Sequence, residues 1–240
     1  PALFAFAFLA QPTQAQAAES IQDYVTDITV NQDSSIRVQE QINYDFGETP
    51  RHGIFRNITY KYKARGGTFK LRISDVSVTD ENGAAYNFTK STSSGDLVLK
   101  IGDADKTITG QHIYKISYTV NRAVNYFDDH DELYWNAIGS EWTVPIANAS
   151  AVIHTPAVVT QMICYTGPDG STEQACSIEG GNTNSVTFKT TGPIEAGEGL
   201  TVVAAVPAGT LTKPTTAQKL GDIFRDNGIL LLPLLVLALM

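Results

Sequence analysis

The sequence is poor in the residues that build metal and nucleotide sites. Only two of its 240 residues are cysteine, and its four histidines are scattered without a metal-ligating partner at a useful spacing. It contains no Gly-x-Ser-x-Gly nucleophile motif and no glycine-rich phosphate-binding loop. We therefore expect no metal, no cofactor and no catalytic activity.

Positive charge is also scarce. The chain has 17 lysines and arginines against 25 aspartates and glutamates, which gives a formal net charge of −8 at pH 7. A nucleic-acid-binding protein needs a basic surface to neutralise phosphates. The composition therefore excludes nucleic acid as a partner, and it disfavours docking flat on an anionic membrane.

Long apolar runs occur only near the two ends. Residues 3–10 are apolar and lead into Ala15-Gln16-Ala17, which is the small-residue spacing of a leader-peptidase site, so residues 1–17 read as a signal peptide. Residues 228–240 contain about a dozen apolar residues where a membrane span needs roughly 20, so they read as the start of a transmembrane helix. Buried helices are the alternative at both ends. A lipid-anchor signal is another alternative at the second.

Between these ends, apolar and polar residues alternate with period two in many short segments. The pattern is clear in residues 36–44, 54–62 and 114–120, and it is typical of half-buried strands. Turn signals such as Asn82-Gly83 separate the segments, and a parity switch near Ser74 indicates a bulge. No helical stripe is present before Thr215. This organisation predicts an all-β protein, an antiparallel β-sandwich.

The predicted sandwich occupies residues 18–210, and residues 211–227 are expected to form a spacer and a short juxtamembrane helix. Pro145 and Pro156 would mark the boundary if the sandwich consists of two β units. A single unit is favoured because no flexible linker occurs between them. The domain would then be extracytoplasmic and held at the cell membrane by its C-terminal helix.

Two pairs of residues are predicted to be structural. Cys164 and Cys176 are expected to form a disulfide, which in the chain-entropy model stabilises the fold by about 3 kcal/mol. Glu40 and Arg56 each interrupt the apolar face of a strand. A lone buried charge is costly, so the two are expected to form a partly buried ion pair. The alternative makes Glu40 a catalytic carboxylate in a cleft.

Acidic and aromatic residues gather in residues 128–142. A loop this rich in carboxylates can hold Ca²⁺, but it lacks the glycine of an EF-type loop, and a solvated acidic loop is the simpler interpretation. Two glutamates bracket two tryptophans, an arrangement that a glycan-binding or glycan-cleaving site also uses. The candidate interaction surface consists of Asp128, Asp129, Asp131, Glu132, Trp135, Glu141 and Trp142.

Three phrases carry a resemblance to a known family. They are His52-Gly53-Ile54-Phe55-Arg56, the pair Ile101-Gly102-Asp103 and Tyr114-Lys115-Ile116-Ser117-Tyr118, and the stretch from Asp131 to Ile146. Together they resemble the predicted bacterial membrane proteins of domain of unknown function 2207, the YciQ-like proteins, over residues 20–206. The resemblance implies the amino-terminal, extracytoplasmic part of a membrane protein. It supplies no catalytic residues.

These observations favour a membrane-tethered module that binds another envelope protein or senses a signal, without catalysis of its own. The alternative is a module that binds or hydrolyses cell-wall glycan through Glu132, Glu141, Trp135 and Trp142. Exposed tryptophans in a groove would favour the glycan alternative, and buried ones would remove its main support.

Overall fold

The computed structural model describes residues 18–64 and 67–227. The expected signal peptide (1–17) and the expected start of a transmembrane helix (228–240) lie outside these ranges. Within the two ranges, no helix is long and apolar enough to cross a membrane.

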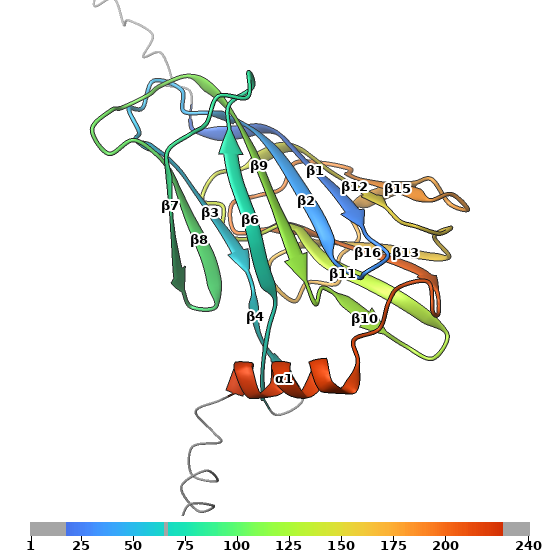
Figure 1. Ribbon diagram of the computed structural model, residues 1–240. Helices are drawn as coiled ribbons and strands as arrows, with labels where there is room; N and C mark the ends of the chain where they lie inside the picture. The colour runs from blue at the N-terminus through green and yellow to red at the C-terminus, as the bar shows by residue number, and fades with distance from the viewer. Residues whose placement is uncertain (1–17, 65–66, 228–240) are drawn as a thin grey trace, which may run out of the picture.

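The described residues form many strands and one helix, as an all-β class predicts. The strands are β1 (Ser20–Val30), β2 (Ile36–Asp45), β3 (Gly53–Thr59), β4 (Lys61–Ala64), β5 (Gly67–Lys70), β6 (Arg72–Thr79), β7 (Phe88–Ser93), β8 (Asp96–Gly102), β9 (Gln111–Asn121), β10 (Val124–Tyr126), β11 (His130–Ile138), β12 (Ile146–His154), β13 (Gln161–Gly167), β14 (Cys176–Glu179), β15 (Ser185–Thr190) and β16 (Gly199–Pro207). The helix is α1 (Thr216–Asn227), and it lies at one end of the molecule, next to the β4–β5 hairpin (Figure 1).

The strands form two layers. One layer is a seven-stranded sheet in the order β14-β15-β12-β1-β2-β9-β6. The other contains a four-stranded sheet, β10-β11-β16-β13, and a three-stranded sheet, β3-β8-β7. Thr26 on β1 donates a hydrogen bond to the Ala137 carbonyl on β11, which joins the seven-stranded sheet to the four-stranded sheet. The predicted β-sandwich is therefore present, with its second layer divided between two sheets.

The prediction of antiparallel pairing needs one correction. β1 pairs antiparallel with β2 on one side, but on the other side it pairs parallel with β12, in a register that places Ile21 opposite Ile146. The sequence pattern of β1 gives no sign of this, because a half-buried strand alternates in the same way in either type of pair.

One hydrophobic core runs through the molecule. It includes Ile21 and Tyr24 before Pro145 and Pro156, and Val186 after them, so both sides of the possible boundary share a core. The predicted bulge is also present, because the register of β6 against β9 shifts between Ser74 and Ser77.

A glycine pair fixes the join between β3 and β8. Gly53 and Gly102 face each other in the antiparallel register, each with a φ of +134°. A Cβ atom on Gly53 would lie 1.9 Å from the Ile101 carbonyl oxygen, and one on Gly102 would lie 1.9 Å from that of His52. Only glycine allows the two backbones to approach this closely.

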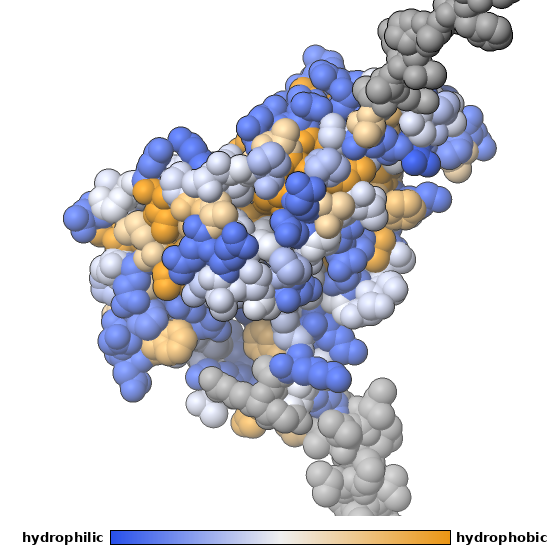
Figure 2. Space-filling view, turned by 180° about the vertical axis from the view of Figure 1, so that it is seen from behind, coloured by the Kyte–Doolittle hydropathy of each residue, from blue (hydrophilic) through white to orange (hydrophobic). Residues whose placement is uncertain are grey.

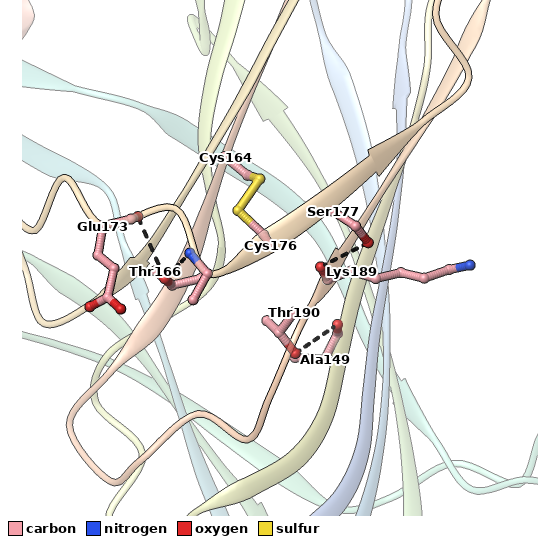
Figure 3. Close-up of a disulfide and its surroundings, with 9 residues drawn as sticks. Ala149, Cys164, Thr166, Glu173, Cys176, Ser177, Lys189 and Thr190 are labelled. Atoms are coloured by element: carbon pink, nitrogen blue, oxygen red, sulfur yellow. Dashed lines mark hydrogen bonds between the residues drawn. A yellow bond between two sulfur atoms is a disulfide. The ribbon is translucent and has the colours of Figure 1, made fainter.

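The predicted disulfide links the two layers at their edges. Cys164 lies on β13, an edge strand of the four-stranded sheet, and Cys176 lies on β14, an edge strand of the seven-stranded sheet (Figure 3). The loop between them is held beside the bridge by Thr166, whose backbone N–H donates to the Glu173 carbonyl at 2.8 Å. The bridge therefore closes one side of the sandwich.

Candidate functional site

The two charged side chains that were expected to face the core meet in the interior. Nε and Nη2 of Arg56 on β3 donate to the carboxylate of Glu40 on β2, at 2.8 and 2.7 Å. The hydroxyls of Tyr24 and Tyr118 donate to the same carboxylate at 2.8 and 2.6 Å. The carboxylate thus has four hydrogen bonds and no exposed area. It is not open to a substrate, and its position is structural.

The protonation states of this network suit a fixed link. Burial raises the pKa of both Tyr24 and Tyr118, so their hydroxyls keep the protons that they donate. Burial alone would lower the pKa of Arg56, but the Glu40 carboxylate, together with the smaller effects of Tyr24 and Tyr118, outweighs burial and raises it. The network therefore connects the seven-stranded sheet to the three-stranded sheet through one ion pair.

The seven residues predicted as an interaction surface do not form one surface. Three of them are buried: Asp131, Trp135 and Trp142, at 0, 4 and 7% exposure. The other four reach solvent to different extents: Asp128, Asp129, Glu132 and Glu141. The prediction is wrong for the buried three. Because side chains alternate along a strand, Asp131 and Trp135 lie on the face of β11 that packs into the core.

The burial of the tryptophans removes the main support for a glycan site. Trp142 packs edge-on against Tyr24 inside the core, with ring centroids 5.8 Å apart. A small depression beside Trp135, lined also by Arg56 and Glu141, has a volume of about 20 Å³. This is room for about one water molecule, which is far less than a sugar ring needs.

Asp131 has a structural role, because its carboxylate binds the segment that follows β16. Its Oδ2 accepts a hydrogen bond from the Leu211 backbone N–H at 3.0 Å, and its Oδ1 lies 4.0 Å from Nζ of Lys213. Its buried carboxylate therefore fixes the start of the predicted spacer to β11.

Thr212 fixes the same segment a second time. Its backbone N–H donates to the Gln32 carbonyl at 2.9 Å, and its carbonyl accepts from the hydroxyls of Ser34 and Tyr126 at 2.8 and 3.1 Å. Residues 211–213 are thus attached to the β1–β2 turn and to β10. The start of the predicted spacer is therefore bound to the domain, and we call residues 211–213 the strap.

The strap leads into α1 through a capping box. The Thr215 hydroxyl accepts a hydrogen bond from the Gln218 N–H at 3.3 Å, and Gln218 Oε1 accepts one from the Thr215 N–H at 2.7 Å. This reciprocal pair satisfies two of the free donors at the helix start. The helix begins at Thr216 and extends to Asn227, so it occupies the second part of the range predicted for the spacer and juxtamembrane helix.

Four charged residues attach α1 to the sheets. Asp222 and Asp226 are one helical turn apart, so they share a face of α1. Arg72 at the start of β6 contacts Asp226 at 2.7 Å and Asp222 at 3.4 Å. Arg122, after β9, contacts Asp226 at 2.7 Å and Asp222 at 3.2 Å. We call these four residues the helix clamp.

Further contacts make the helix clamp rigid. Asp226 accepts a hydrogen bond from the Lys70 N–H at 3.2 Å, while Arg122 donates to the Lys70 carbonyl at 2.7 Å. The Arg122 guanidinium lies 4.2 Å from the ring centroid of Phe69, a cation–π contact. Arg122 has a φ of +72°, which is uncommon for a residue with a long side chain. Asn227 pairs with both backbone groups of Thr68.

Electrostatics favour the ionised form of the central carboxylate in the clamp. Burial alone would raise the pKa of Asp226, but hydrogen bonds from Arg122, Arg72 and the Lys70 N–H outweigh burial and lower it. The clamp is therefore formed at neutral pH and depends on this carboxylate staying charged.

The opposite face of α1 is apolar and, among the described residues, largely exposed. Leu220, Ile223 and Phe224 are spaced as one helical stripe and are 51, 55 and 57% exposed. A helix on a globular protein ordinarily buries its apolar stripe and exposes its charged residues. In α1 the arrangement is reversed, because the acidic face contacts the domain.

A second apolar area with exposed side chains lies on the outside of the four-stranded sheet. Tyr134 on β11, Val203 on β16 and Ile163 on β13 stand directly opposite one another, so they share one face. Tyr134 and Ile163 are 52 and 38% exposed, which places this face outward, whereas Val203 between them is only 5% exposed. Tyr165 follows Ile163 on the same side and is half-buried. We call these four residues the outer face. Figure 2 shows that apolar side chains gather in patches on one side of the molecule, among polar ones.

Acidic groups border the outer face. Glu132 lies two residues before Tyr134 on the same side of β11, and Ser140 donates a hydrogen bond to the exposed Asp169 at 2.8 Å. Burial, with the nearby charges of Asp96 and Asp169, raises the pKa of Tyr62 to about 12. The interaction surface predicted from the sequence includes Glu132 but neither Tyr134 nor Tyr165.

Neither the clamp nor the outer face was predicted from the sequence. The signal for the clamp was present in residues 220–226, where two aspartates one turn apart lie opposite three apolar residues. The signal for the outer face was the apolar residue Tyr134 between the inward-facing positions of β11. Their partners are far away in the chain, so the sequence could not show what they contact.

Solved structures similar to the chain come from much longer proteins. Native leukotriene A4 hydrolase from Saccharomyces cerevisiae matches with 12% identity and a TM-score of 0.48, over 78% of this chain and 29% of that chain. An M1 zinc metallopeptidase from Deinococcus radiodurans matches with 11% identity and a TM-score of 0.44, over 80% of this chain and 43% of that chain. The chain thus spans less than half of either protein, and similarity at this level carries no argument about function. No curated protein matches the chain in sequence.

The resemblance seen in the sequence extends over most of the described domain. The family model described as "Predicted membrane protein (DUF2207) N-terminal domain" matches residues 20–206, which run from the start of β1 to the end of β16. The chain therefore belongs to the DUF2207 family of predicted membrane proteins and contains its N-terminal domain.

Proposed function

We propose that the chain is a membrane-held, non-catalytic module that binds another envelope protein through its outer face. The observation that carries this proposal is the pair of exposed apolar side chains Tyr134 and Ile163, which flank the buried Val203 on the outward face of the four-stranded sheet. Tyrosine is enriched at protein interfaces because it combines a large apolar area with a polar tip.

The charges around the outer face indicate the kind of partner. Glu132 and Asp169 lie at its border, and Asp128 and Asp129 are exposed in the turn before β11. A partner with an apolar centre and a basic rim would complement this surface, and the acidic border would steer it into place. This is the part of the predicted acidic surface that remains available for contact.

The domain is proposed to lie on the extracytoplasmic side of the membrane. Its support is the Cys164–Cys176 bridge, because disulfides form and persist in oxidising compartments. Trapping free thiols in growing cells would test this. Two oxidised cysteines are expected, and two free thiols in the cell would contradict the proposed location.

The partner proposal can be tested by site-specific crosslinking in native membranes. A photo-crosslinking residue at position 163 is expected to form an adduct with one defined protein. Ile178 on β14 is a matched control, because it is the same residue type with nearly the same exposure, 37% against 38%. The adduct should be absent from position 178, and Tyr134→Glu should abolish it at position 163.

Two results would overturn the proposal. One is an equal pattern of adducts from positions 163 and 178, which would show that the outer face has no preferred partner. The other is an adduct at 163 that Tyr134→Glu leaves unchanged. Thermal unfolding of the Tyr134→Glu variant serves as the control for folding, since an exposed residue away from the core should change stability little.

A further inference from the structure

We infer that α1 lies in the interfacial region of a lipid bilayer, with Leu220, Ile223 and Phe224 inserted among the lipids. The helix clamp then fixes the orientation of the β-sandwich relative to the membrane. This inference does not depend on the protein partner proposed above.

In α1 the charged face contacts the domain and the apolar face is exposed, the reverse of an ordinary surface helix. Its acidic face is bound to Arg72 and Arg122, so the apolar stripe points away from the domain. Turning the helix over to bury the stripe would break all four contacts of the clamp. The structure thus holds three large apolar side chains in an exposed position, which is favourable only if something apolar covers them.

The position of α1 in the chain indicates that lipid covers its apolar stripe. An apolar run of residues 229–240 begins two residues after the helix ends, and the family consists of predicted membrane proteins. A helix that directly precedes such a run is held close to the membrane surface. With an apolar stripe and a basic residue on each flank, Lys219 and Arg225, α1 has the composition of a helix lying in the membrane interface.

The charge around α1 differs from that of the whole chain. The whole chain has a net charge of −8, yet the β4–β5 hairpin next to α1 contains Lys61, Lys63 and Lys70. Lys61 and Lys63 are exposed, and Lys63 stands opposite Thr68, which binds the end of α1. These lysines, together with Lys219 and Arg225 on α1, form a basic end that suits anionic lipid headgroups. The net charge of the whole chain disfavours docking flat on an anionic membrane, but this end of the molecule is locally basic and can contact one.

The inference can be tested by measuring the depth of α1 residues in vesicles. The full chain is reconstituted in vesicles of phosphatidylethanolamine and phosphatidylglycerol, with an environment-sensitive fluorophore on Phe224→Cys. Gln218→Cys is the matched control, because residue 218 is exposed on the same helix but lies off the apolar stripe. Quenchers are attached to the lipid chains in one series and dissolved as iodide in the other.

The expected result is that lipid-attached quenchers reduce the fluorescence at residue 224 several-fold more than at residue 218, and that iodide acts in the opposite order. The inference is overturned if iodide quenches both positions equally. It is also overturned if the unlabelled Phe224→Cys variant forms a disulfide between two chains and the labelled variant is not quenched by lipid, because a second copy would then cover the stripe.

A second variant tests the clamp separately from insertion. Replacing Asp222 and Asp226 by asparagine removes the charges that bind Arg72 and Arg122 but leaves the apolar stripe intact. Residue 224 should remain in the lipid, whereas hydrogen exchange at the Thr68 and Lys70 amides, which bond to the helix, should become faster. Unchanged exchange at both amides would show that the clamp does not fix the domain.

Discussion

The buried ion pair allows a quantitative prediction. In the Arg56→Met variant, the aliphatic stem keeps most of its volume but the guanidinium is lost. Glu40 then loses two charge-assisted hydrogen bonds and keeps only those from the hydroxyls of Tyr24 and Tyr118. Its carboxylate, which has no exposed area, becomes a buried charge without a partner.

The expected loss is large. Removing one member of a buried pair lowers the free energy of unfolding by about 3–5 kcal/mol. Since a domain of ordinary stability has about 5–15 kcal/mol in total, the variant should retain only part of its stability. For a domain of this size, 1 kcal/mol shifts Tm by about 2–4 °C, so Tm should fall by about 6–20 °C.

The assay is chemical unfolding followed by tryptophan fluorescence, because Trp135 and Trp142 are both buried and report on the core. Arg51→Met is the matched control. Arg51 pairs with Glu19 at 2.6 Å, but its side chain is 54% exposed and the pair is screened by solvent, so the loss of stability should be small.

A second substitution distinguishes charge from packing. Adding Glu40→Gln to Arg56→Met removes the orphaned charge, so part of the lost stability should return. The reasoning would be refuted if Arg56→Met were as stable as the original chain. It would also be refuted if Glu40→Gln lowered stability further in the Arg56→Met background, because the cause would then be packing rather than charge.

Three further predictions follow from the disulfide, the clamp and the glycine pair. Replacing Cys164 and Cys176 by serine should lower the free energy of unfolding by about 3 kcal/mol, as measured by the denaturant midpoint, and a reductant should then have no further effect. Because the folded-state pKa of Asp226 is lowered, the clamp should be fully formed above the unfolded value near 3.9 and lost as pH falls through the folded value, as seen by faster amide exchange in α1. Gly53→Ala should destabilise the chain by at least about 2 kcal/mol in thermal unfolding, whereas Gly192→Ala, with nothing within 4 Å of the new Cβ, should change little.

Much of the fold could be predicted because alternation along a strand records which face is buried. The period-two pattern located β2, β3 and β9, and it placed Glu40 and Arg56 on their inward faces, where they meet. Two charges on the faces of two core strands have few ways to be satisfied other than by each other. The pairing of Glu40 with Arg56 could therefore be predicted from the local pattern of each strand.

The candidate surface was less predictable because composition does not show which side chains point into the core and which point into solvent. Trp135 and Tyr134 are neighbours in the sequence, yet one is in the core and the other is in solvent. The alternation of Leu133, Trp135 and Ala137 already indicated this, but the cluster of acidic residues drew attention to the segment as a whole. In the clamp, Arg72 and Asp226 are 154 positions apart, and no local pattern connects them.

The parallel pair of β1 and β12 bears on how the chain acquires its structure. β1 can form a hairpin with β2 as soon as the first turn is made, but its other edge must wait for residue 146 and those after it. Until then, a strand destined for the middle of a sheet has a row of unpaired backbone groups that could bind another copy. Closing such distant contacts is slow. Between the synthesis of β2 and of β12 the chain therefore passes through an interval in which one edge of β1 is open to aggregation.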